Sequence, residues 1–108
     1  EGKTIKALLD QIATTKYQQL YIVTGMVKDK DIDGVLALLP KNATYFFCQP
    51  NVERALPANE LAQKAALHNL IGKFFTSVAD AFEKAKEKSN PKDLIFIGGS
   101  TFVVAEIL

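Results

Sequence analysis

The strongest constraint on the fold is that short β-rich apolar runs alternate with segments of helical periodicity. Four runs predict strands, over Leu20–Thr24, Ala43–Cys48, Lys73–Thr76 and Leu94–Ile97. Five segments predict helices, over Lys3–Thr14, Ile32–Leu39, Asn59–Leu70 with Gly72 as its terminator, the stretch that follows Ser77 as its N-cap, and Thr101–Leu108. Strands separated by helices favour right-handed crossovers and a parallel sheet. We therefore predict an α/β fold, a three-layer αβα Rossmann-like domain with a mainly parallel sheet, four strands of which lie in this chain.

The length and charge of the chain limit its organisation and its partners. With 108 residues, it is expected to form a single domain over residues 1–108. Its 13 Lys and Arg residues nearly balance 12 Asp and Glu residues, and Arg54 is the only arginine. Nucleic acids and anionic membranes attract a concentrated basic surface, so we expect neither as a partner.

Cysteine and histidine content bears on the compartment and on metal binding. Cys48 is the only cysteine, so it cannot form a disulfide within the chain, and a lone thiol is typical of a reducing compartment. No apolar run approaches the roughly 20 residues of a membrane span, and no signal peptide is apparent. We therefore expect a cytoplasmic protein. One His and one Cys cannot build a zinc site, and we assign no metal ligand and no catalytic residue to this chain.

Two loops have the composition of a ligand site, because ligands of parallel α/β sheets bind where strands lead into helices. The first follows the strand Leu20–Thr24, and the loop after the second strand adds Arg54 as an anion-binding candidate. Ammonium groups there could pair with a phosphate or a carboxylate. The alternatives are that Asp31 only caps the next helix and that Arg54 forms a structural salt bridge. The candidates in the first loop are Lys28, Asp29, Lys30 and Asp31.

The second candidate loop follows the fourth predicted strand and has the sequence Gly98-Gly99-Ser100-Thr101. Glycines allow a ligand to approach the backbone closely, and the N–H groups at the start of a helix can hold an anion. Ser100 or Thr101 would add a hydroxyl. A tight turn with Ser100 as an N-cap is the alternative.

Four segments together carry a family resemblance, by their order and their spacing: Gly25–Asp31, Leu38–Pro40, Arg54–Leu56 and Gly98–Glu106. Over essentially its whole length, the chain resembles the C-terminal domain of folylpolyglutamate synthase/dihydrofolate synthase, in the bacterial bifunctional form. That family belongs to the Mur ligase superfamily. The loop with Gly25, Asp29, Lys30 and Asp31 and the pair Gly99-Ser100 are its most specific parts.

The resemblance implies one domain of an ATP-dependent ligase that adds L-glutamate to dihydropteroate or to folylpolyglutamate through an acyl phosphate. It implies that ATP and Mg²⁺ bind mainly to a central domain that this chain lacks, so the partners would be L-glutamate, the folate or dihydropteroate, and the rest of the same polypeptide. Ser100 matches the region that binds the carboxylate of the incoming amino acid, with Gly99 and Thr101 beside it. Lys28, Asp29, Lys30 and Asp31 match a loop that faces the interdomain cleft.

The start of the chain fits an excised domain, because Glu1 is not a methionine and the sequence opens directly into a helical pattern. On that interpretation the chain alone would be inactive. Two other functions stay open: a domain of a cell-wall muropeptide ligase, and a non-catalytic α/β binding module. An upstream reading frame with a Gly-Lys-Ser/Thr phosphate loop would favour a ligase, whereas a start codon just before Glu1 would favour the module.

Overall fold

A computed structural model describes residues 10, 16, 18–28, 31–98, 103 and 106. Strands and helices alternate through the described part of the chain, as the sequence predicts. They are β1 (Leu20–Thr24), α2 (Ile32–Leu38), β2 (Thr44–Phe47), α3 (Ala58–Leu67), β3 (Gly72–Phe74), α4 (Val78–Lys88) and β4 (Leu94–Gly98). The helices predicted over Lys3–Thr14 and Thr101–Leu108 fall largely outside the described residues.

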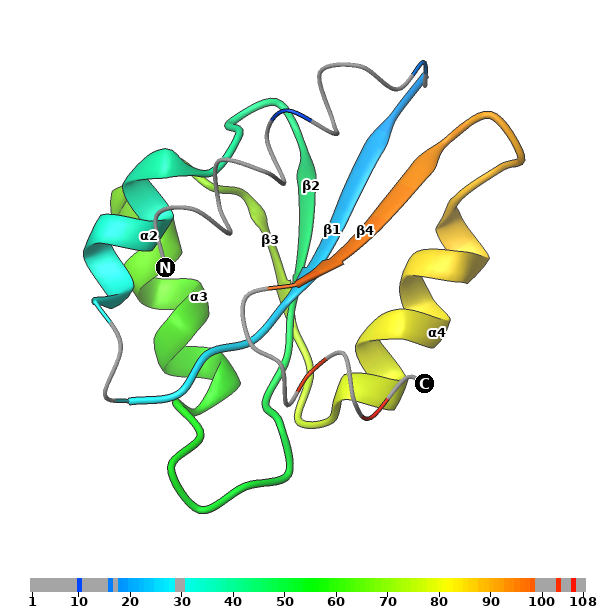
Figure 1. Cartoon of the computed structure of the whole chain (residues 1–108). Helices are drawn as coiled ribbons and strands as arrows, with labels where there is room; N and C mark the ends of the chain where they lie inside the picture. Colours follow the sequence, from blue (N-terminus) through cyan, green and yellow to red (C-terminus); the bar gives the residue numbers. More distant parts are fainter. Residues whose placement is uncertain are drawn as a thin grey trace.

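The four strands form one parallel sheet in the order β3-β2-β1-β4. Helices α2 and α3 pack on one face of this sheet and α4 on the other (Figure 1), which confirms the three-layer αβα prediction. Because all strands are parallel, their carboxyl ends meet at one edge, and the loops after β1 and β2 leave the sheet there.

Strand β2 shows why the central strands read as continuous apolar runs. Successive side chains of a strand point to opposite faces. Tyr45 and Phe47 therefore pack into the cluster beneath α2 and α3, whereas Phe46 packs with Val78 and Ala81 beneath α4. Both faces of the strand are covered, so polar residues do not alternate with apolar ones.

The ends of the helices confirm one prediction and correct another. Ser77 caps α4 as predicted, because its side-chain oxygen accepts a hydrogen bond from the backbone N–H of Asp80 at 3.1 Å. The prediction that Gly72 terminates α3 is wrong. The helix ends at Leu67, and Asn69 takes the positive φ of 63° that turns the chain away. Gly72 instead begins β3, where a Cβ would overlap the carbonyl oxygen of Tyr45.

Candidate functional site

The loops that follow β1 and β2 are joined by backbone hydrogen bonds at the carboxyl edge of the sheet. Val27 and Ala55 form an isolated antiparallel bridge. Next to this bridge, the N–H of Lys28 donates to the carbonyl of Arg54 at 2.8 Å, and the N–H of Leu56 donates to a carbonyl of the first loop at 2.9 Å. The two predicted cations Lys28 and Arg54, which are 26 positions apart in the sequence, are therefore joined by a direct backbone hydrogen bond.

Close backbone packing at the end of β1 holds the joined loops against the sheet. The N–H of Cys48 donates to the carbonyl of Thr24 at 2.8 Å. A Cβ on Gly25 would lie only 2.6 Å from the carbonyl oxygen of Cys48, so glycine is required for this approach. Met26 and Val27, which follow, are both buried. The first loop thus begins from a fixed point, and Lys28 is its first exposed residue.

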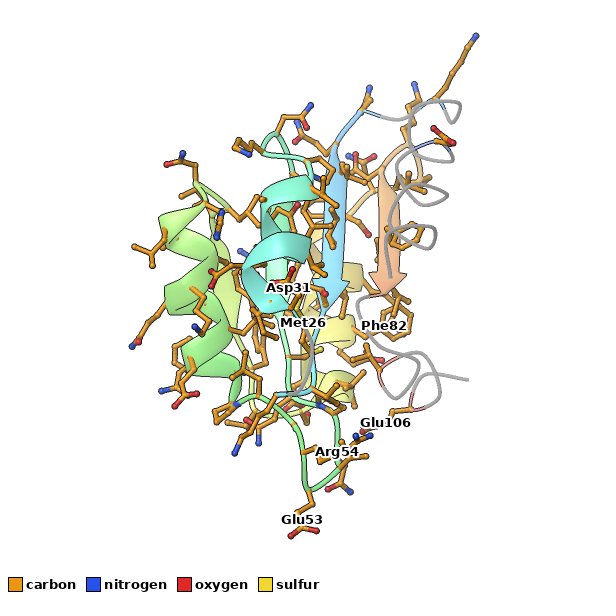
Figure 2. All side chains as sticks on the ribbon, turned by 60° about the vertical axis from the view of Figure 1, so that its left-hand side comes forward. Met26, Asp31, Glu53, Arg54, Phe82 and Glu106 are labelled. Atoms are coloured by element: carbon orange, nitrogen blue, oxygen red, sulfur yellow. The ribbon has the colours of Figure 1, made fainter. Side chains whose placement is uncertain are left out.

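Asp31 caps α2, as the alternative interpretation of this residue held. Its Oδ1 accepts a hydrogen bond from the backbone N–H of Gly34 at 3.2 Å, and its side chain is exposed beside the start of the helix (Figure 2). A capping carboxylate satisfies one of the free N–H groups of the first helical turn. Asp29 and Lys30 lie outside the described residues, so their predicted position facing a cleft stays a prediction.

The second candidate loop predicted from the sequence begins where β4 ends at Gly98, whose register partner on β1 is Thr24. This pairing places the end of β4 beside the start of the first loop. Gly99, Ser100 and Thr101 lie outside the described residues. Their predicted role in substrate binding therefore stays a prediction.

Glu106 contacts the loop after β2, a contact that sequence reasoning missed. Its Oε2 accepts a hydrogen bond from the backbone N–H of Asn51 at 2.6 Å. Figure 2 shows Glu106 at the same end of the molecule as Glu53 and Arg54, beyond the carboxyl ends of the strands. The two bonded residues are 55 positions apart, and the donor is a backbone group that any residue but proline carries, so no local sequence signal could have found this bond.

Cys48 is a buried residue directly after β2. Burial, together with a smaller contribution from the negative charge of Glu106, raises the pKa of its thiol to about 12. A thiol must lose its proton to act as a nucleophile. Cys48 therefore stays protonated near neutral pH, which fits a structural residue better than a nucleophile.

In the part of the chain that the structure describes, no group of three or more His, Cys, Asp or Glu side chains is placed to hold a metal. The single histidine, His68, contacts Asp33 of α2 at 3.1 Å. Among the described residues, no helix is long and apolar enough to cross a membrane.

Sequence comparison supports the predicted family. The sequence profile of the family described as "Mur ligase, glutamate ligase domain" matches residues 2–101. A dihydrofolate synthase/folylpolyglutamate synthase from Buchnera aphidicola (subspecies Schizaphis graminum) is 33% identical over 101 residues. That match covers 93% of this chain but only 23% of the relative, so the chain spans about a quarter of the length of such proteins.

Solved structures of the same enzymes have the same fold. Escherichia coli FolC in complex with DHPP and ADP superposes with a TM-score of 0.84 at 28% identity, over 95% of this chain and 24% of that one. A bifunctional folylpolyglutamate synthase/dihydrofolate synthase with Mn, AMPPNP and L-glutamate bound superposes with a TM-score of 0.83 at 26% identity, over 95% and 25%. With a profile match over residues 2–101 and a superposition over 95% of its length, this chain belongs to the Mur ligase family, as a glutamate ligase domain.

Proposed function

We propose that this chain is the C-terminal domain of an ATP-dependent ligase that adds L-glutamate to dihydropteroate or to folylpolyglutamate. In this reaction a carboxylate of the acceptor is activated as an acyl phosphate. The amine of L-glutamate attacks the acyl carbon, phosphate leaves, and an amide forms. The domain serves as one side of a cleft, and the rest of a longer polypeptide is its partner on the other side.

The observation that carries this proposal is the pair of joined loops at the carboxyl edge. They hold Lys28 and Arg54 on adjacent backbone, in a fold that superposes on a relative described with AMPPNP and L-glutamate bound. All the proposed substrates are anions: a nucleoside triphosphate, an amino acid with two carboxylates, and a folate with a glutamate tail. Cations held in fixed positions stabilise such groups, and they also neutralise charge that develops as phosphate leaves.

The residues of this chain fit only part of what the reaction needs. Lys28 and Arg54 fit an anionic group, whereas the described residues supply no carboxylate cluster for Mg²⁺. When bound, ATP supplies the phosphoryl group that activates the acceptor. We assign its main binding residues, and those for Mg²⁺, to the remaining three quarters of the longer polypeptide.

Within the chain, we assign the carboxylate of L-glutamate to the loop after β4. Ser100 would donate its hydroxyl, and Gly99 and Thr101 would offer backbone N–H groups. The cleft-facing set would be Lys28, Asp29, Lys30, Asp31 and Arg54. A reaction on intracellular cofactors, together with a lone thiol that forms no disulfide, fits a cytoplasmic protein.

The test is the substitution Ser100→Ala in the longer polypeptide. We expect the KM for L-glutamate to rise about tenfold, because a hydroxyl that bonds a charged carboxylate contributes roughly 1.5 kcal/mol or more. The KM for ATP should change much less. Ser89→Ala is the matched control, because Ser89 follows α4 at the opposite edge of the sheet. If both KM values were unchanged in the Ser100 variant, the assignment would be wrong.

A further inference from the structure

Glu106, which lies outside the loop after β2, accepts a hydrogen bond from the backbone of that loop. Its Oε2 lies 2.6 Å from the backbone nitrogen of Asn51, a short distance for a charge-assisted bond. The carboxylate is also close enough to Cys48, at the start of the same loop, to add to the rise of that thiol's pKa. Glu106 therefore faces the beginning of the loop.

The loop after β2, which Glu106 contacts, also carries Arg54. Between Asn51 and Arg54 the backbone turns tightly, because the N–H of Val52 donates to the carbonyl of Pro50 at 2.8 Å and the N–H of Ala55 donates to that of Val52 at 3.1 Å. A residue fixed at Asn51 is thus connected to Arg54 through one compact turn rather than through a long mobile segment.

The connection continues into the first loop. The carbonyl of Arg54 accepts the N–H of Lys28 at 2.8 Å, and Val27 pairs with Ala55. Both cations therefore belong to one hydrogen-bonded unit, and a single side chain from the C-terminal segment closes that unit. A constraint at Asn51 therefore limits where Lys28 can lie.

We propose that Glu106 is a positioning residue, which holds the two joined loops in place through the backbone N–H of Asn51 and so sets the position of the cations Lys28 and Arg54 at the ligand edge. The inference rests on the proposed function only in its kinetic consequence. The structural part is a tether: the bond from Asn51 to Glu106 restrains the loop after β2, and the bond from Lys28 to Arg54 passes that restraint to the loop after β1. This part stands on the hydrogen bonds alone.

The tether is tested by amide hydrogen exchange measured by NMR. In Glu106→Ala we expect the amides of Asn51 and Lys28 to exchange roughly threefold to tenfold faster, the range that a net hydrogen bond implies. The amide of Asp80, which is bonded to Ser77 at the start of α4, should not change. Unchanged exchange at Asn51, or a change at Asn51 that does not reach Lys28, would overturn the proposal.

Two further variants separate the hydrogen bond from other effects. Glu106→Gln keeps an acceptor oxygen at the same place, so it should restore most of the protection of Asn51. Asn51→Ala keeps the backbone donor and removes only an exposed side chain, so it should behave like the parent protein. If Glu106→Gln accelerated exchange as much as Glu106→Ala, or if Asn51→Ala did so, this hydrogen bond would not be the tether.

The kinetic consequence is measured in the longer polypeptide by titrating L-glutamate and ATP. Glu106→Ala should raise the KM of at least one of the two by threefold or more, with kcat within about twofold, and Glu106→Gln should restore it. If Glu106 only stabilised the fold, Glu106→Ala would lower the thermal midpoint and the active fraction but would leave both KM values unchanged. That result would overturn the positioning role. If the parent polypeptide showed no ligase activity at all, the proposed function would fail, whereas the exchange result would still decide the tether.

Discussion

Replacing Gly25 with alanine tests whether the loop after β1 begins from a backbone contact with the loop after β2. The added Cβ would lie 2.6 Å from the carbonyl oxygen of Cys48 and 3.1 Å from Cδ of Pro50. Ordinary contact begins at 3.4 Å, so the two strand exits must separate by about 0.8 Å, which strains a packed interior. The neighbouring hydrogen bond between Cys48 and Thr24, now 2.8 Å long, would lengthen as well.

The magnitude follows from two opposing effects. Overpacking of a rigid site costs about 1–3 kcal/mol. Alanine recovers about 0.4–1 kcal/mol by restricting the unfolded chain. We therefore expect Gly25→Ala to lower the free energy of unfolding by about 1–2 kcal/mol, which moves the urea midpoint down by about 1 M.

The assay is urea unfolding of the 108-residue chain, with Gly98→Ala as the matched control. Gly98 ends the neighbouring strand, but among the described residues a Cβ there would meet only the ring of Phe96, at 3.0 Å, and a half-buried side chain can move away. The control should stay within about 0.5 kcal/mol of the parent. Equal stability of the two variants would refute the argument that backbone contact fixes the first loop.

Two more predictions concern the cap of α2 and the buried thiol. Asp31→Ala should lower the free energy of urea unfolding by about 1 kcal/mol by removing the bond to Gly34, whereas Asp31→Asn should retain most of it; equal losses would contradict the capping role. Burial raises the pKa of Cys48 from 9.0 to about 12, so the unfolded state loses this proton first. Stability should therefore fall as pH rises above about 9, by up to about 1.4 kcal/mol per pH unit, and unfolding curves at about pH 8 and pH 10 should show a weaker dependence in Cys48→Ala.

The fold could be predicted largely because its signals are local. The covered strands β1 and β2 appear as uninterrupted apolar runs, and a serine in front of an amphipathic segment marks the start of α4. The end of α3 was placed wrongly because glycine is the usual residue after a helix. Here Asn69 takes the left-handed turn, and the expected glycine serves a close approach to Tyr45.

The candidate site could be predicted only in part. The position of Lys28 and Arg54 at the ligand edge follows from the rule for parallel sheets, and it needs no knowledge of their contacts. Their backbone connection does not follow, because the bridge between Val27 and Ala55 depends on how two loops meet in space. The bond from Glu106 to Asn51 is also tertiary, and a carboxylate that binds a backbone group leaves no complementary residue in the sequence.

The central claim, that this chain is one side of a ligase cleft, is tested most directly by ATP-dependent incorporation of labelled L-glutamate into dihydropteroate or folate. The longer polypeptide that contains this chain and the 108-residue chain alone would be assayed side by side. We predict incorporation, with matching release of ADP, by the longer polypeptide and none by the chain alone. Incorporation by the 108 residues alone, or ADP release by the longer polypeptide that needs a muropeptide instead of a folate, would contradict the account.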